Sequence, residues 1–168
     1  MAMNITPHVF KDDGSIPNNS LPLLLYSKAI DVNGSDPARS IERRFAANGW
    51  AKMWRNGIYT FHHYHSTSHE VLGCFSGSAK VLLGGERGEL LTLEAGDVVL
   101  IPAGVGHFNK GASSDFGVVG AYPRGFNWDM QYGRPGERPK VLQNISALPV
   151  PPLDPVTASD GGLKEYWT

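Results

Sequence analysis

Between Asn56 and Tyr122 the chain alternates short apolar stretches with turn residues such as Gly, Pro and Ser. Apolar stretches of this length, separated by only a few residues, are typical of antiparallel strands joined by tight turns. We expect strands near residues 57–65, 70–76, 79–83, 89–93, 97–101, 106–109 and 116–122. Strands this short, with connections this short, predict a β-sandwich or a small barrel.

The first fifty residues show two further patterns. Residues 1–20 are polar and rich in turn residues, so we expect an extended arm, and the apolar stretch 21–30 predicts a strand. Asp36 followed by Pro37 is a typical helix start, with Asp36 as the N-cap. Ile41 and Phe45 then lie on one face at helical spacing, and the helix is expected to end near residues 48–49.

The last forty residues carry a weaker pattern. Residues 141–148 are expected to form one more edge element of the sheet. The tail ends in Tyr166 and Trp167, two large aromatic side chains that we expect to dock on the body of the protein or on a partner.

Length and charge exclude several classes of protein. A chain of 168 residues suits one domain, and its 15 basic and 16 acidic residues nearly cancel. We therefore expect no nucleic-acid partner and no membrane partner. The single cysteine, Cys74, and the absence of a signal-peptide pattern in residues 1–14 favour a cytoplasmic location.

The candidate chemistry lies in two blocks. His63 and His65 are two residues apart, and on a strand such side chains share a face. Glu70 opens the next predicted strand, and His107 follows a Pro-x-Gly turn. Three imidazoles and one carboxylate that converge inside a β-structure form a ligand set for a divalent transition metal.

The spacing within these blocks resembles the two signature motifs of the cupin superfamily. The first reads Gly57, five residues, His63-Tyr64-His65, four residues, Glu70, six residues, Gly77. The second reads Gly96, five residues, Pro102-Ala103-Gly104, two residues, His107. Its final asparagine is missing because Gly111 holds that place, and Asn109 is a candidate substitute.

The resemblance implies a mainly β fold, a double-stranded β-helix or jelly-roll barrel, with a short N-terminal helix and extended flanks. It implies a single domain over residues 1–168, with the barrel core at about 50–125, an N-terminal arm and helix at 1–49 and a C-terminal extension at 126–168. It also implies His63, His65, Glu70 and His107 as the metal ligands. The flanks resemble those of uncharacterised bacterial conserved-barrel cupins, a likeness that brings no reaction with it.

Each residue near the predicted ligands has a functional and a structural interpretation, and strand alternation helps to choose between them. The histidine set could instead be a hydrogen-bonded structural cluster, but a metal removes the cost of burying all four polar groups. His69 should face away from Glu70, as a residue behind the ligands or on the surface, or else replace Glu70 as a ligand. His62 should also face outward, and Cys74 is expected to be a small buried residue rather than a nucleophile.

Four residues are candidates for the wall of a ligand pocket. Tyr59 and Phe61 share the parity of His63 and are expected to face inward, Tyr59 as a possible hydrogen-bond donor or catalytic group and Phe61 more simply as core. Arg55 is a candidate anchor for an anionic substrate at the mouth, or else a solvated surface residue. Asn109 follows His107 on the same face, and it is a candidate for a residue that contacts the metal ligands without binding the metal itself.

The sequence thus predicts a cupin that binds one divalent transition metal, Fe, Mn, Ni or Zn, and a small polar or carboxylate-bearing molecule. A dioxygenase, an isomerase or a decarboxylase would fit this ligand set. A non-catalytic metabolite-binding protein and a structural cupin are the alternatives, because the fold hosts many functions. We expect a homodimer, since a barrel of this size has sheet edges that need cover.

Overall fold

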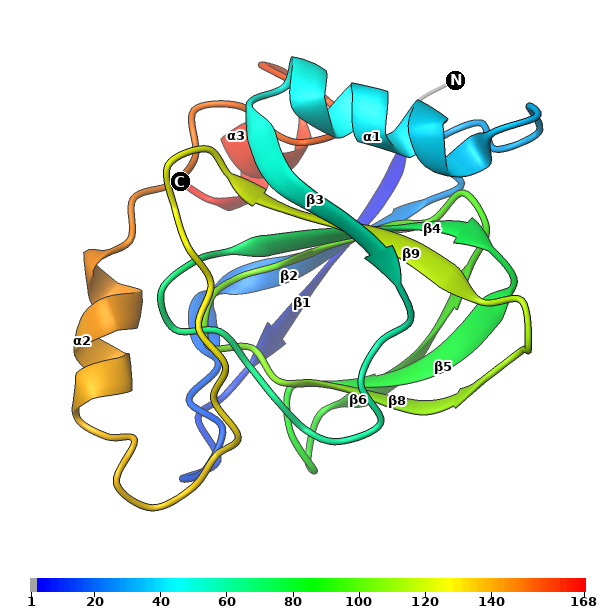
Figure 1. Ribbon diagram of the computed structural model, residues 1–168. Coiled ribbons are helices and arrows are strands. Elements are labelled where there is room, and N and C mark those ends of the chain that lie inside the picture. Colours follow the sequence, from blue (N-terminus) through cyan, green and yellow to red (C-terminus); the bar gives the residue numbers. More distant parts are fainter. Residues whose placement is uncertain (1–2) are drawn as a thin grey trace.

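In the computed structural model, which describes residues 3–168, the strands form two antiparallel sheets that face each other (Figure 1). The large sheet has the order β1-β2-β7-β4-β9-β3, and the small sheet has the order β6-β5-β8. The strands are β1 (Asn4–Phe10), β2 (Asn19–Ser27), β3 (Trp50–Asn56), β4 (Glu70–Ser76), β5 (Ser78–Leu83), β6 (Glu89–Glu94), β7 (Val98–Ile101), β8 (His107–Ala112) and β9 (Gly117–Pro123). Three helices, α1 (Pro37–Ala47), α2 (Lys140–Ala147) and α3 (Gly162–Tyr166), complete the described chain.

The large sheet is buried on both faces. Leu72 of β4 and Val99 of β7 are register partners that face the small sheet, where they join a core with Val81 of β5. Their neighbours Val71 and Leu100 point to the opposite face, into a second core. Because every side chain of the β7 segment VVLI is buried, this strand shows no alternation of polar and apolar residues.

Helix α1 covers the outer face of the large sheet, and it begins and ends where the sequence predicts. The Asp36 side chain accepts a hydrogen bond from the Arg39 amide, and Pro37 occupies the first turn, so the predicted N-cap is confirmed. Ile41 and Phe45 are fully buried against the sheet. The helix approaches β4 closely at Gly73, where an added Cβ would lie 2.6 Å from the side chain of Ile41.

The N-terminal arm is part of the sheet, which corrects the expectation for residues 1–49. Residues 4–10 form β1, which pairs with β2, and β2 pairs with β7 in the middle of the protein. The barrel therefore extends beyond the expected core of residues 50–125. The turn-rich composition of residues 1–20 hides this strand because Pro7 and three polar residues interrupt its apolar pattern.

The C-terminal extension packs in two places, with α2 beside Ile16 and Tyr64 and the tail on the outer face of the large sheet. The expected edge element at 141–148 is wrong, because these residues form helix α2, which buries Val141. Trp167 is 2 % exposed, and its indole nitrogen donates to the carbonyl of Pro22 at 2.8 Å, so the tail docks on the body. No helix within residues 3–168 combines the length and apolar character needed to cross a membrane.

Candidate metal centre

The first histidine block lies on an irregular segment, so the predicted strand at 57–65 is wrong. The segment runs along the edge of β8 and is held there by an isolated bridge in which His63 and His107 exchange backbone hydrogen bonds of 3.2 and 2.9 Å. Tyr64 makes a similar bridge with Gln131 on its other side. These bridges preserve the extended alternation locally. As a result, His63 and His65 face one side, while Tyr64 is buried on the other.

The second block brings His107 to the same place. Gly104 has a φ of +91°, and its amide donates to the His65 carbonyl at 2.7 Å, so the Pro-x-Gly turn is tied to the first block. An added Cβ at Gly104 would lie 2.4 Å from the carbonyl oxygen of Asn18, which makes glycine necessary at this turn. β8 then starts at His107 with its side chain turned inward.

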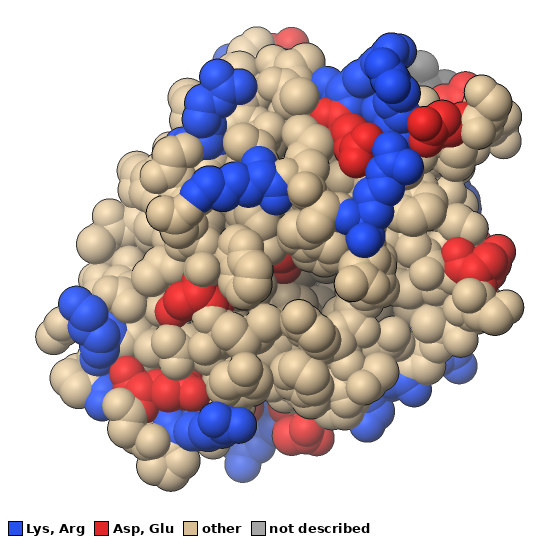
Figure 2. Space-filling view, viewed as in Figure 1, with Lys and Arg blue, Asp and Glu red and all other residues tan. Residues whose placement is uncertain are grey.

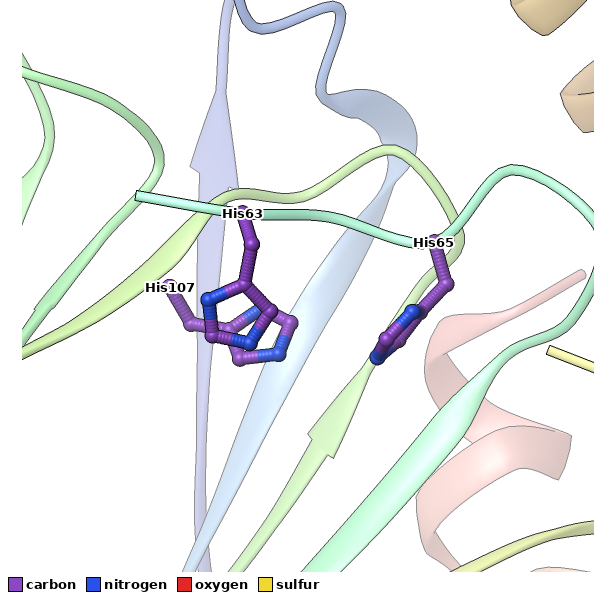
Figure 3. Close-up of side chains that lie close together, drawn as sticks. All are labelled: His63, His65 and His107. Carbon is purple, nitrogen blue, oxygen red and sulfur yellow. The ribbon is translucent and has the colours of Figure 1, made fainter. Parts of the chain in front are cut away.

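The three histidines converge in a buried cluster (Figure 3). One ring nitrogen of each of His63, His65 and His107 lies within 4.8 Å of the others, a spacing that could hold one metal ion. Glu70, at the first position of β4, places Oε1 3.4 Å from His65 Nε2 and 3.2 Å from His107 Nε2. The structure therefore brings the three expected histidines together and places the Glu70 carboxylate beside two of them.

Backbone carbonyl groups fix the orientation of each imidazole. The Nδ1 atoms of His63 and His107 lie 3.0 and 3.2 Å from the carbonyl oxygens of Phe61 and Val105, and His65 Nδ1 contacts the carbonyl of Asp129. A carbonyl can only accept, so each Nδ1 carries a hydrogen, and in the neutral ring Nε2 then presents a lone pair. His107 Nε2 is buried without a hydrogen-bond partner. This arrangement fits a metal ion, because ligating histidines commonly donate their second N–H to such carbonyls.

The charges of His63 and Glu70 suit the same role. Burial, with a smaller contribution from the adjacent His107, lowers the pKa of His63 to about 2, so the His63 imidazole is neutral. Burial alone would raise the pKa of Glu70, but His65 and His107 outweigh it and hold the pKa of this carboxyl below its usual range. For His65, burial lowers the pKa and the Glu70 carboxylate raises it by more. Neutral imidazoles and an ionised carboxylate are the forms that bind metals, so an ion that binds here would displace the proton that Glu70 favours on His65.

A cavity of about 350 Å³ opens above the cluster. Figure 2 shows this face of the molecule hollowed near its centre, where mainly uncharged atoms surround the opening. Aromatic and apolar side chains make most of the wall, and the four candidate ligands lie at its base. The apolar part of the wall comes from Trp54, Ile58, Tyr59, Leu72, Tyr122, Trp128 and Met130.

The predicted pocket residues lie in different places. Tyr59 lines the cavity but is 53 % exposed, so it stands at the mouth rather than below the metal site. Arg55 also lines the cavity, and its guanidinium is held by the Glu42 carboxylate at 2.9 and 2.7 Å. Phe61 is 41 % exposed and stacks on Tyr59 outside the cavity, which corrects its expected place in the core.

Asn109 does not reach the cavity either. Its side chain donates to the carbonyl of Ile58 at 3.2 Å and accepts from the Gly111 amide at 2.9 Å. Its contacts thus fasten the 57–65 segment to β8. Cys74 is buried, and burial raises the pKa of its thiol to about 11, in line with the structural role expected of it.

His62 and His69 point away from the cluster, as alternation predicts. His62 is partly buried, and its Nδ1 lies 3.5 Å from Glu86. His69 is 3 % exposed and lies against Trp167 on the other face of the sheet, so it is buried rather than on the surface. Burial lowers the pKa of His69 to about 4, which the backbone of Pro149 offsets only in part.

A segment that the sequence analysis left unassigned completes the site. Residues 124–132, here called the strap, pass over the first histidine block on the way to α2 (Figure 1). Trp128 of the strap stacks on Tyr122, and the Asp129 carboxylate accepts hydrogen bonds from the amides of Ser66 and Thr67 at 2.6 and 3.1 Å. No periodic pattern marks this segment in the sequence, and only its tryptophan and aspartate hint at a role.

Comparison with known proteins assigns the chain to a family. No model of a protein family matches it. The uncharacterised protein YjlB of Bacillus subtilis is 40 % identical over 161 residues, which cover 95 % of this chain and 94 % of YjlB. The chain belongs to the YjlB family. The order of strands in its two sheets and the spacing of its two motifs are those of a cupin jelly roll, which confirms the fold predicted from the sequence.

The chain is also similar to parts of solved structures. It matches dTDP-4-dehydrorhamnose 3,5-epimerase from Elizabethkingia anophelis at 12 % identity and a TM-score of 0.44, with 76 % of this chain and 77 % of the epimerase covered. Procruciferin from Brassica napus matches at 14 % identity and a TM-score of 0.38, with 76 % of this chain covered. A salicylate 1,2-dioxygenase from Pseudaminobacter salicylatoxidans matches at 14 % identity and 0.35, again over 76 % of this chain. The chain spans only 26 % of the procruciferin chain and 30 % of the dioxygenase chain.

Proposed function

We propose that this YjlB-family protein binds one divalent transition-metal ion through His63, His65, His107 and Glu70, and that the cavity above the ion binds a small molecule. One observation carries the proposal. Three backbone carbonyls hold the three Nδ1 atoms, and this turns the three Nε2 atoms toward one point beside the Glu70 carboxylate. With the hydrogens on Nδ1, the Nε2 atoms of His65 and His107 face the Glu70 oxygen at 3.4 and 3.2 Å, an arrangement of acceptors that a cation would stabilise.

The charge of the loaded site favours an anionic oxygen ligand. A divalent ion with one carboxylate and three neutral imidazoles keeps a net positive charge, and carboxylate or enolate oxygens complement it. When bound, such an ion supplies Lewis-acid polarisation or, if it is iron, oxygen activation. Iron, manganese, nickel and zinc all accept this donor set.

The walls of the cavity favour an apolar body for that ligand. Trp54, Trp128 and Met130 offer aromatic and thioether surface, whereas the Arg55 guanidinium is already paired with Glu42. The anionic end of a ligand would therefore go to the metal rather than to Arg55. We infer a small molecule with an enol, hydroxy-acid or carboxylate group on an apolar body, and a dioxygenase, isomerase or decarboxylase reaction would suit it.

A non-catalytic binding protein is the second candidate, and one observation favours it. The hydroxyl group of Tyr122, a buried residue of the cavity wall, already makes hydrogen bonds with Glu70 and Trp54. Tyr59, at the mouth, is then the main candidate for proton transfer, and it is half exposed. General acid–base catalysis needs a group within hydrogen-bond reach of the reacting atom.

Metal analysis followed by a turnover screen tests the proposal. Protein purified without added metal is expected to contain close to one first-row ion per chain, and His63→Ala or His107→Ala is expected to lose it. His62→Ala is the matched control, because His62 lies next to His63 and faces away from the cluster. Oxygen uptake by the iron-loaded protein with small hydroxy acids and enols then separates enzyme from binder. Equal metal content in His63→Ala and wild type would reject the proposal.

A further inference from the structure

A second cavity, of about 400 Å³, lies apart from the metal centre. It is enclosed by the end of α1, the start of the strap and the proline-rich segment 148–153, and it shares no lining residue with the metal cavity. Its walls are mainly apolar, with contributions from Trp50, Phe126 and Leu148. A concave apolar site with few polar groups is the usual form of a small-molecule site.

His69 lines one wall of this cavity. Its Nδ1 accepts a hydrogen bond from the Ala103 amide at 2.9 Å, so the neutral ring carries its hydrogen on Nε2. Nε2 lies on the opposite side of the ring, toward Pro149, which with His69 lines the cavity. This N–H is buried and faces the backbone of Pro149, so it is turned toward the protein rather than toward the contents of the cavity. His69 therefore contributes ring surface to the cavity wall.

Arg124 supplies a cation to the same cavity. Its side chain is exposed, and it forms no ion pair with any acidic residue in the described part of the chain. Arg55 at the metal cavity differs, since its guanidinium is already held by Glu42. A guanidinium group pairs with a carboxylate through two parallel hydrogen bonds. Arg124 therefore favours a negatively charged ligand in this cavity.

We propose that this cavity is a second ligand site, for a small apolar carboxylate. The apolar walls and the His69 ring contact the hydrocarbon body, and Arg124 pairs with the carboxylate. The proposal is independent of the metal centre, because none of its residues lies in the metal cavity.

Benzoate and octanoate are the probes, with benzyl alcohol and octanol as neutral counterparts of the same shape. Binding to the full-length protein, stripped of metal by chelation, is followed by amide and imidazole nitrogen chemical shifts. Without metal, the first cavity offers no ion to the carboxylates. At least one acid is expected to bind saturably and to shift the signals of His69 and Phe126, while the alcohols bind about tenfold more weakly, which corresponds to roughly 1.4 kcal/mol.

Three variants locate the site. Ala47→Trp places a large side chain at the cavity wall from an exposed helix position and is expected to abolish binding, whereas Ala112→Trp, also exposed and outside both cavities, is the matched control. Arg124→Gln is expected to weaken binding of the acid to the level of its alcohol. The proposal is overturned if neither acid binds, if the acid and its alcohol bind equally, or if the shifts surround His63 and persist in Ala47→Trp.

Discussion

The hydroxyl group of Tyr122 donates a hydrogen bond of 2.7 Å to Oε2 of Glu70. The same hydroxyl accepts a hydrogen bond of 2.9 Å from the indole nitrogen of Trp54. Burial, together with the nearby Glu70 carboxylate, raises the pKa of Tyr122 far above its usual range, so the hydroxyl stays protonated. Tyr122 therefore directs Oε2 away from the histidines and leaves Oε1 beside His65 and His107.

Removing this hydroxyl should weaken metal binding without removing a ligand. In Tyr122→Phe, Glu70 loses the bond that fixes its orientation, and loss of such a supporting contact typically costs about 10- to 100-fold in metal affinity. Competition with a chelating dye measures the affinity. Tyr132→Phe is the control, because Tyr132 is 38 % exposed and lies outside the cavity. An unchanged affinity in Tyr122→Phe would mean that Glu70 is not a ligand.

Metal binding should also stabilise the fold. An ion present at a hundred times its Kd contributes about 2.7 kcal/mol, which corresponds to roughly 5–10 °C in the melting temperature of a domain of this size. Thermal unfolding with and without the ion is expected to show this shift for wild type and for His62→Ala. The shift should vanish in His107→Ala, and its persistence there would place the ion elsewhere.

The sequence predicts the ligands well because their positions depend on short-range geometry. His63 and His65 face one way even without a regular strand, since the bridge between His63 and His107 imposes an extended conformation locally. The remaining six predicted strands between residues 70 and 122 are confirmed in position. His69 shows the limit of strand alternation. Alternation predicts that its side chain faces away from Glu70, but it does not predict that the C-terminal tail buries it.

The rest of the site depends on contacts that no local pattern contains. Trp128 and Asp129 reach the first histidine block from more than sixty residues away, as the separation between Asp129 and Ser66 shows. Their segment has neither strand nor helix periodicity. The expected place of Phe61 in the core is wrong for a different reason. The alternation of a regular strand does not continue through the irregular segment that holds Phe61, which makes only isolated bridges.

The end of the strap should loosen in acid. Glu137 accepts hydrogen bonds from the hydroxyl of Tyr64 and from the amides of Tyr132 and Gly133. Burial opposes ionisation, but these hydrogen bonds outweigh it and lower the pKa of Glu137 below 4.5. A carboxyl with a depressed pKa contributes stability above its unfolded pKa and loses it as the pH falls through the folded value.

We therefore expect the amide signals of Tyr132 and Gly133 to titrate together at a pH below 4.5, as Glu137 takes up its proton. Chemical shifts recorded from pH 6 to pH 3 provide the measurement. In Glu137→Gln the same two amides should be insensitive to pH over this range. A midpoint above 4.5 in wild type would contradict the proposed direction of the shift.

The assembly expected from the sequence stays a prediction. β6 is an edge strand of the small sheet, and Leu90 on it is 54 % exposed. An exposed apolar residue on a sheet edge favours association. Sedimentation at micromolar concentration is expected to give the mass of a homodimer, and Leu90→Lys is expected to shift it toward the monomer. A monomer mass for wild type would contradict the expectation.

The C-terminal tail should be a large contributor to stability. Trp167 packs against His69 and buries its ring in the outer core, and truncation of a buried tryptophan to alanine costs about 3–5 kcal/mol. Trp167→Ala is expected to lower the melting temperature by roughly 6–20 °C. Trp167→Phe keeps most of the ring but loses the hydrogen bond to Pro22, and should cost about 1 kcal/mol for that bond.

Trp128→Ala is the matched control for this series. Trp128 is 42 % exposed and lines the metal cavity, so its loss should change ligand binding more than the free energy of unfolding. Denaturant titration of the variants measures both tryptophans on one scale. If Trp167→Ala were no less stable than Trp128→Ala, the tail would not be docked in solution as it is in this fold, and the contact between His69 and Trp167 would not form.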